Sequence, residues 1–160
     1  MTRYLKIDKE IEPFNKKIII EGDKSLSIRW VLLASQAIGK SKAYNLLMSE
    51  DVIAALNSIK KLGIKTKYNK NYCEILGNGI NGFKYKKNLT LDASNSGTLG
   101  RLLLGLLIKT PKKIKLIGDK SLSKRDFSRV TKPLEKFGAK FYYRIKNKLP
   151  LKILGSKSIK

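Results

Sequence analysis

Four segments of the chain carry the hydrophobic periodicity of helices, and they are of two kinds. Residues 25–38 and 96–109 are apolar on nearly every face, which is typical of helices buried inside a core. Residues 49–62 and 126–137 each carry one apolar stripe with charged residues opposite, which is typical of helices that lie half exposed on a core. The pattern therefore predicts two buried and two half-exposed helices.

Short runs rich in β-branched and aromatic residues separate these segments and predict strands. The strands are expected at residues 16–20, 42–47, 64–68, 72–76, 89–91, 113–117, 140–145 and 151–154. Gly39 and Gly63 follow the first two helical segments and are expected to end them. Residues 1–15 are polar and irregular, so they are interpreted as a lead-in or an edge strand.

The predicted order β-α-β-α-β-β occurs twice. The second helix of the first unit aligns with the second helix of the other unit at a constant offset in residue number. Lys61-Leu62-Gly63 matches Lys136-Phe137-Gly138, for example. Coincidence remains an alternative, because Leu-Gly after an amphipathic helix is a common ending. We predict an α+β (mixed α/β) fold of two βαβαββ units, residues 16–79 and 88–155, within a single partial domain spanning 1–160.

Composition narrows the chemistry that the chain can perform. The chain has one cysteine and no histidine, so a disulfide, the usual zinc sites and the Ser-His-Asp and Cys-His arrangements are excluded. Any proton transfer must use Lys, Asp, Glu, Tyr or water. No apolar run reaches the roughly 18 uncharged residues of a membrane span, and residues 1–6 lack the apolar core of a signal peptide. A cytoplasmic protein without a membrane partner is expected.

The formal net charge of +23 invites a nucleic-acid interpretation, since a basic field attracts phosphates. The lysines are dispersed along the whole chain, however, and arginine is rare. A basic RNA-binding module would also need exposed aromatics on a sheet face, and adjacent Tyr142 and Tyr143 can present at most one ring outward. The dispersal favours small anionic substrates over a polynucleotide partner, which stays as an alternative.

Three turns at the starts of helices concentrate donors for an anion. Residues 22–29 (GDKSLSIR) lie between a β-branched run and a helix, where free backbone N–H groups converge. Lys24 and Ser25 lie in the first helical turn, and Arg29 follows Ser25 by four residues on the same face. An ordinary capped turn with solvated cations is the alternative. The spacing does not fit the P-loop motif, because Asp23 stands where that motif has glycine.

The second turn, residues 94–98, can cap the helix that follows it and can let a ligand approach its backbone closely. There Asn95 can cap the helix, Gly97 permits a ligand to approach the backbone, Thr98 offers a hydroxyl, and Arg101 lies one turn further on. In the third turn, residues 118–125 (GDKSLSKR), Arg125 stands at a predicted helix start, where the helix dipole disfavours a cation unless an anion accompanies it. If the two buried helices are parallel and adjacent, the turns form one electropositive pocket.

Residues 22–29, 91–103 (LDASNSGTLGRLL) and 118–125 together resemble, in order and spacing, the three N-terminal signatures of the 5-enolpyruvylshikimate-3-phosphate synthase family. The resemblance implies two lobes, each of three βαβαββ units, of which this chain would hold part of one. It also implies transfer of the carboxyvinyl group of phosphoenolpyruvate to the 5-hydroxyl of shikimate 3-phosphate, in the shikimate pathway of aromatic amino acid and chorismate biosynthesis, without metal or organic cofactor.

The resemblance also assigns substrate-binding roles to individual residues. Lys24 would contact both substrates, Ser25 and Arg29 the shikimate phosphate, and Asn95, Gly97 and Arg125 the phosphoenolpyruvate, with Thr98 and Arg101 supporting the same turn. The chain departs from the family pattern at Glu21, Ile28 and Ser94, where Pro, His and Gly are usual.

Family members are well over twice as long, and their second lobe carries the groups that move protons. No catalytic residue is therefore expected within this chain, and the missing lobe, as a separate chain, is an expected partner. Apolar faces of the first and third helices are expected to be exposed, which favours association. The sister family that acts on UDP-N-acetylglucosamine is the enzyme alternative, but its reactive cysteine has no counterpart in residues 118–125.

Overall fold

The computed structural model describes residues 20–158 continuously and, before them, Lys6, Asp8, Glu10, Glu12, Pro13, Asn15, Lys17 and Ile18. This part of the chain contains five helices and seven strands. The helices are α1 (Lys24–Gln36), α2 (Glu50–Lys61), α3 (Gly97–Leu106), α4 (Lys120–Lys124) and α5 (Ser128–Lys136). The strands are β1 (Ile38–Tyr44), β2 (Lys65–Tyr68), β3 (Tyr72–Asn78), β4 (Thr90–Asp92), β5 (Ile114–Ile117), β6 (Lys140–Tyr143) and β7 (Leu151–Leu154).

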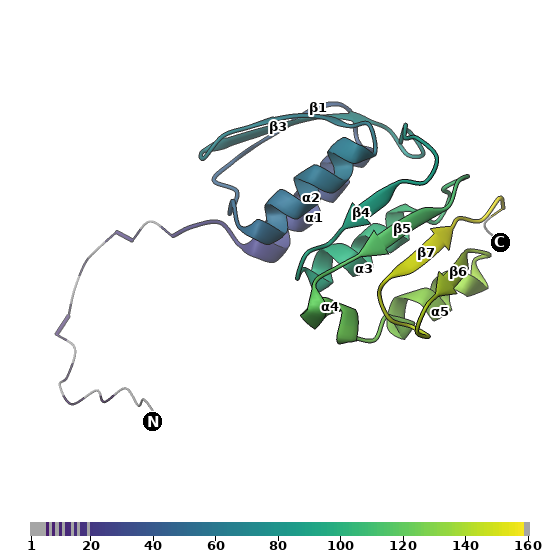
Figure 1. The fold of residues 1–160 in the computed structure, drawn as a ribbon. Helices are drawn as coiled ribbons and strands as arrows, with labels where there is room; N and C mark the ends of the chain where they lie inside the picture. The colour runs from purple at the N-terminus through teal and green to yellow at the C-terminus, as the bar shows by residue number, and fades with distance from the viewer. Residues whose placement is uncertain are drawn as a thin grey trace.

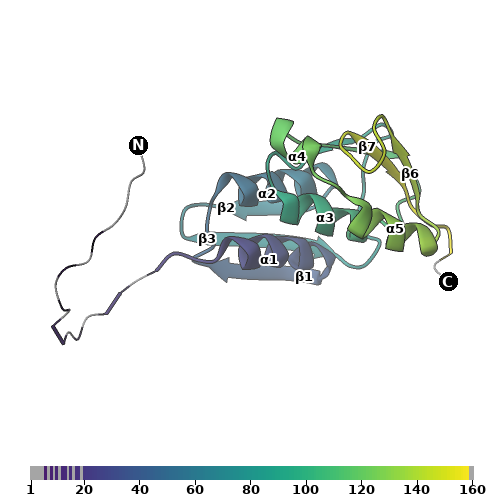
Figure 2. The same cartoon turned by 90° about the horizontal axis from the view of Figure 1, so that it is seen from below.

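Two small sheets pack against the helices. The first sheet has the order β1-β3-β2 and is antiparallel throughout, whereas the second has the order β4-β5-β7-β6 with a parallel β4–β5 pair. In Figure 1 the second sheet lies in front of α3 and α5, while β1 and β3 run along the top above α1 and α2. Figure 2 shows α1, α2 and α3 side by side, with α1 and α2 lying against the first sheet. The predicted mixed α/β class is confirmed.

The two halves of the chain build their sheets in the same way. The order β1-β3-β2 of the first half corresponds to β5-β7-β6 of the second, and both strand pairs are antiparallel in each half. A duplicated unit would produce this correspondence, so it supports the division into residues 16–79 and 88–155, which stays a prediction. In the first half, a counterpart of β4 would be the strand expected at residues 16–20. There Lys17, Ile18 and Ile20 have no strand structure, and the two other positions lie outside the described residues.

One continuous hydrophobic core joins the halves and leaves an apolar face of α1 exposed, as expected for the first helix. On α1, Leu26 and Leu33 are 64% and 68% exposed, because α2, α3 and β3 cover only the face that carries Ile28 and Val31. Conversely, α2 is more buried than its stripe indicates, since it packs against α1, α3, β2 and β4. Hydrophobic periodicity shows which residues are apolar, whereas their burial depends on which helices and strands pack against them in the fold.

Several element boundaries also differ from the predictions. The first helix ends at Gln36, and Gly39 lies inside β1 with a φ of 90°, so the strand begins four residues earlier than expected. The predicted helix 126–137 begins at Ser128, because Asp126 accepts a hydrogen bond from the Ser128 N–H at 2.6 Å and closes a turn instead. The short helix α4 was not predicted. The predicted lead-in of residues 1–15 lies largely outside the described residues.

None of the helices in the described part of the chain is long and apolar enough to cross a bilayer.

Candidate functional site

The second and third of the predicted turns are joined directly by hydrogen bonds. Because β4 and β5 are parallel, their carboxyl ends meet at one edge of the sheet. There the Asp119 N–H donates to the Ser94 carbonyl at 2.8 Å, and the Ala93 N–H donates to the Ile117 carbonyl at 3.0 Å. The start of α3 and the start of α4 therefore form one continuous polar edge.

Ser96, not Asn95, caps α3, which corrects the sequence-based assignment. The Ser96 hydroxyl accepts from the Leu99 N–H at 3.2 Å and Ser96 is buried, because its position allows its side chain to reach back over the first turn. The Asn95 amide is consequently free to act elsewhere. Its oxygen accepts a hydrogen bond from the Arg125 guanidinium at 3.2 Å, which links the two turns through side chains as well.

Arg101 is held against the backbone of both turns. Its guanidinium donates to the Gly97 carbonyl and to the Asp126 carbonyl, each at 3.3 Å, and lies 5.2 Å from the centre of the Phe127 ring. These contacts use neutral acceptors and a ring face, so they orient the cation without neutralising it.

Gly97 is required for this close approach. A Cβ at residue 97 would lie 2.7 Å from an Arg101 nitrogen and 3.0 Å from an Arg125 nitrogen. Real side chains do not tolerate the shorter distance, so the two guanidinium groups occupy the space that any other residue would fill. Thr98 lies half-buried on the same first turn of α3.

Arg125 lies at the C-terminal end of α4, not at the start of a helix. The argument that the helix dipole disfavours a cation there is therefore wrong, since the dipole favours cations at C-termini. Arg125 is exposed, and no ion pair in the described part of the chain involves Arg101 or Arg125. Two cations thus lie side by side at the turn with neutral partners only.

The first turn, residues 22–29, packs against the segment that follows β1. Asp23 caps α1 by accepting from the Leu26 N–H at 2.7 Å, and the Ser27 hydroxyl accepts from the Leu47 N–H at 3.1 Å. Gly22 approaches the Asn45 carbonyl so closely that a Cβ would lie 2.2 Å from that oxygen. Contacts with residues 45–47, which are distant in the sequence, therefore fix the position of the turn.

The three predicted residues of this turn have different surroundings. The Lys24 ammonium forms an ion pair with Asp51 on the first turn of α2, at 3.2 Å, so part of its charge is neutralised. Ser25 is half-buried and Arg29 is exposed. The pairing with Asp51 had no signal in the sequence, because the two residues lie on different helices.

The first turn and the joined second and third turns share one end of the molecule. Figure 1 shows the N-terminal ends of α1 and α3 and the short α4 at the same end, and α1 contacts α3. The N-terminal part of α2 lies between the first turn and the other two, because Asp51 pairs with Lys24 while Glu50 and Asn57 line a hollow of about 350 Å³ together with Ser94. We take this end as the candidate site. It is called the turn cluster below and consists of Lys24, Ser25, Arg29, Asn95, Gly97, Thr98, Arg101 and Arg125.

The three departures from the family pattern lie in different environments. Ser94 adopts a φ of 49°, a left-handed conformation that glycine reaches without strain, and its N–H donates to the Asp92 carboxylate at 2.7 Å. Ile28 is fully buried in the core. Glu21 is exposed just before the first turn.

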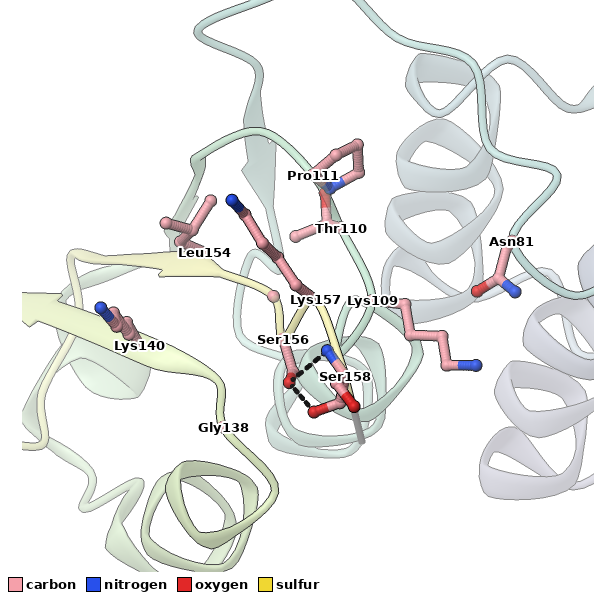
Figure 3. Close-up of a pocket in the computed structure, with 11 residues that line it drawn as sticks. Asn81, Lys109, Thr110, Pro111, Gly138, Lys140, Leu154, Ser156, Lys157 and Ser158 are labelled. Carbon is pink, nitrogen blue, oxygen red and sulfur yellow. Dashed lines mark hydrogen bonds between the residues drawn. The ribbon is translucent and has the colours of Figure 1, made fainter. Parts of the chain in front are cut away.

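Other sites in the described residues offer weaker chemistry. A hollow of about 1020 Å³ beside residues 109–111 and 154–158 contains none of the predicted site residues (Figure 3). Its polar lining is mainly lysines and the hydrogen-bonded pair Ser156 and Ser158. Burial raises the pKa of the Cys73 thiol to about 11, which disfavours a nucleophilic role. No group of three potential metal ligands occurs in the described part of the chain.

Comparison with known proteins agrees with the three signatures. The family model for EPSP synthase (3-phosphoshikimate 1-carboxyvinyltransferase) matches residues 9–160. The 3-phosphoshikimate 1-carboxyvinyltransferase of Streptococcus mutans is 40% identical over 142 residues, which are 88% of this chain and 33% of the relative. That of Ruthia magnifica is 43% identical over 141 residues, which are 88% of this chain and 32% of the relative.

Solved structures give the same match. EPSP synthase from Acinetobacter baumannii superposes with a TM-score of 0.84 at 32% identity, over 91% of this chain and 33% of that one. The chain therefore spans about a third of the length of the proteins that it resembles.

Proposed function

Since the chain belongs to the EPSP synthase family, we propose that its turn cluster binds the two substrates of a 3-phosphoshikimate 1-carboxyvinyltransferase. The reaction transfers the carboxyvinyl group of phosphoenolpyruvate to the 5-hydroxyl of shikimate 3-phosphate and releases phosphate. Both substrates carry a phosphate and a carboxylate, which a cluster of oriented cations recognises.

The observation that carries the proposal is the packing of Arg101 and Arg125 around Gly97, with no carboxylate partner within the described residues. Two adjacent cations repel one another, and an anion between them relieves the repulsion. Asn95, Gly97 and Arg125 would bind phosphoenolpyruvate, while Thr98 and Arg101 support the turn. Lys24, Ser25 and Arg29 would bind shikimate 3-phosphate, and Lys24 would contact both substrates, as the family resemblance implies.

This part of the enzyme supplies positioning and electrostatic stabilisation. A preorganised set of donors lowers the barrier by holding the reacting groups together and by stabilising charge that develops on them. The aspartates of the three turns serve as caps and turn acceptors, as Asp23, Asp92 and Asp119 illustrate. Proton transfer would therefore use groups from the two thirds of the family sequence that this chain does not span, and a separate polypeptide carrying them is the proposed partner.

Calorimetric titration with shikimate 3-phosphate tests the proposal. We expect saturable one-to-one binding that weakens about tenfold or more in Arg29→Ala, because a charge-assisted bond to phosphate is lost. Lys70→Ala is the matched control, since it removes the same charge from the exposed turn between β2 and β3. Binding that is absent from folded protein, or weakened equally by both substitutions, would overturn the proposal.

A phosphate-release assay tests the partner. The chain is mixed with the remaining two thirds of a relative, produced as a separate polypeptide, in the presence of both substrates. Release is expected only when both polypeptides are present and is expected to fall in Arg125→Ala, with Arg129→Ala on α5 as the control. If both folded polypeptides bind substrate but release no phosphate together, the separate partner is rejected while the binding proposal stands.

A further inference from the structure

The outward face of the second sheet carries a row of cations that no predicted role uses. Side chains alternate across this sheet, so Leu116, Leu151 and Ile153 are buried while Lys115 and Lys152 are exposed. The strand register places Lys115 opposite Lys152, and Lys152 opposite Tyr142. A continuous row across three strands therefore presents two lysines and a tyrosine to the outside.

Directly opposed lysines are unfavourable, because like charges in a cross-strand pair destabilise a sheet. Among the four strands of this sheet, Asp92 is the single acidic residue, and its carboxylate already accepts from the Ser94 N–H at the far end of β4. The row thus has no internal counter-charge. An external anion is the partner that its electrostatics favour.

The first sheet provides the contrast within the same molecule. Its outward face also carries lysines, but Glu74 lies opposite both Lys42 and Lys67, and its carboxylate forms an ion pair with Lys40 at 3.4 Å. The Tyr72 hydroxyl donates to the same carboxylate at 2.7 Å. The first sheet therefore places a carboxylate directly opposite two of its lysines, whereas no acidic residue lies opposite Lys115 or Lys152 in the second sheet.

Aromatic and shape features of the second sheet indicate what kind of anion fits. Tyr142 is 42% exposed, and the Lys113 ammonium lies 4.2 Å from its ring centre. Shallow hollows of about 270 and 260 Å³ share Lys115 and Lys152 as lining residues, and the second also includes Tyr142 and Arg144. An extended sheet face with an exposed ring between cations suits a flexible chain of phosphates and flat bases.

We propose that this face, defined by Lys113, Lys115, Tyr142, Arg144 and Lys152, binds single-stranded nucleic acid. The lysines and Arg144 contact phosphates, and Tyr142 stacks on a base. The proposal is independent of the turn cluster, which lies at the carboxyl ends of β4 and β5. It gives a role to a basic surface that the binding of small substrates leaves unused.

Fluorescence anisotropy with a labelled oligouridylate of about 12 nucleotides tests the proposal, a length within the site sizes of single-strand binders. The variant Lys115→Gln/Lys152→Gln is compared with Lys42→Gln/Lys67→Gln, which removes the same charge from the first sheet. We expect the former to weaken binding at least about fivefold and to lower the salt dependence, as a log–log slope, by roughly 1.4, because each phosphate contact contributes about 0.7. The latter should leave both quantities nearly unchanged.

A second set of variants separates base stacking from general attraction to polyanions. Tyr142→Ala should weaken oligouridylate binding about fivefold or more while Tyr142→Phe and Tyr44→Ala do not, since one stacked base contributes at least that factor. Lys115→Arg/Lys152→Arg should retain binding, which guards against loss through misfolding. Equal weakening by the two Lys→Gln pairs would reduce the effect to net charge and overturn the proposal. So would an unchanged affinity in Tyr142→Ala, or an inorganic polyphosphate that binds as tightly as the oligonucleotide.

Discussion

At the scale of single residues, the turn cluster depends on small side chains that make room for large cations. Gly97 admits two guanidinium groups to the backbone of α3, and Gly22 admits the Asn45 carbonyl. Ser94 takes up a left-handed conformation between these elements and is stabilised by the Asp92 carboxylate. The geometry of the candidate site is therefore set by the space at particular positions as much as by the charged groups themselves.

Gly97→Ala is predicted to separate binding from stability. The added methyl group meets only the ends of Arg101 and Arg125, which can shift, so the fold should stay within about 1 kcal/mol of the wild type in urea unfolding. Displacement of the two guanidiniums should weaken phosphoenolpyruvate binding about tenfold in a titration.

Gly105→Ala on the same helix is the matched control for this prediction. No atom lies within 4 Å of a Cβ built there, so the substitution should stabilise the protein by up to about 1 kcal/mol and leave binding unchanged. Unchanged binding in Gly97→Ala would contradict the proposed close approach.

The hydrogen bond between Tyr72 and Glu74 should produce a stability difference that depends on pH. It lowers the pKa of Glu74 below 4.5 and, as the largest cause, raises the pKa of Tyr72 from 10.0 to about 12. The glutamate contribution is present above its ordinary pKa and lost as the pH falls, whereas the tyrosine contribution is present below pH 10.0 and lost as the pH rises through about 12.

Tyr72→Phe should therefore destabilise the protein most near neutral pH. The difference in unfolding free energy from the wild type should shrink in acid, as Glu74 becomes protonated, and again in strong alkali. Urea unfolding across the pH range measures it, with Tyr44→Phe as the control, because Tyr44 contacts the Tyr72 ring without sharing the carboxylate. A difference that is constant with pH would show that the hydroxyl acts without Glu74.

At the scale of elements, the helices differ in how many neighbours cover them. The second helix, α2, is packed on several sides, whereas α1 is covered on one face and leaves Leu26 and Leu33 exposed. Ile38, which follows α1 in the chain, is 93% exposed. An apolar surface of this kind favours association between copies or with another polypeptide.

Leu33→Gln is predicted to reduce self-association without lowering stability. Leu33 is 68% exposed and glutamine is a good helix former, so the unfolding free energy should change by less than about 0.5 kcal/mol. Sedimentation velocity should show fewer oligomers at high protein concentration. The neighbouring Leu32 is 3% exposed, so Leu32→Gln should instead destabilise the fold by about 3 kcal/mol, and equal effects of the two substitutions would contradict this assignment of faces.

At the scale of the whole molecule, charge is the dominant feature. The chain has 35 basic and 12 acidic residues, so repulsion among like charges opposes the compact state. The residues that the structure describes form only three ion pairs, and two of them involve exposed lysine ammoniums on α1 and β1. Added salt should therefore weaken the repulsion among like charges more than it weakens the attraction within ion pairs.

Raising the salt concentration from a few millimolar to about 0.15 M, where the Debye length is about 8 Å, should raise the thermal unfolding midpoint by several degrees. Differential scanning calorimetry in sodium chloride measures the shift. Sucrose at matched osmolality is the control, because it stabilises without screening charge. A midpoint that falls with salt would mean that attractive pairs dominate.

The sequence by itself determined most of the elements, the three turns and the family. Periodicity acts within a few residues, so it located α2 and α5 closely and β7 at its observed bounds, residues 151–154. The order and spacing of the three signatures were sufficient to indicate the family to which the chain belongs. The positive charge was equally visible in the composition.

Only the tertiary structure decided which residues meet. The Asn95–Arg125 hydrogen bond, the Lys24–Asp51 ion pair and the Lys115–Lys152 juxtaposition join residues far apart in the chain. Such contacts follow from strand register and helix packing, which no local pattern encodes. The position of Arg125 at the end of α4 was mispredicted, and the residues of α1 that stay exposed were identified only in the fold, for the same reason: a residue's neighbours across the fold set its charge environment and its burial.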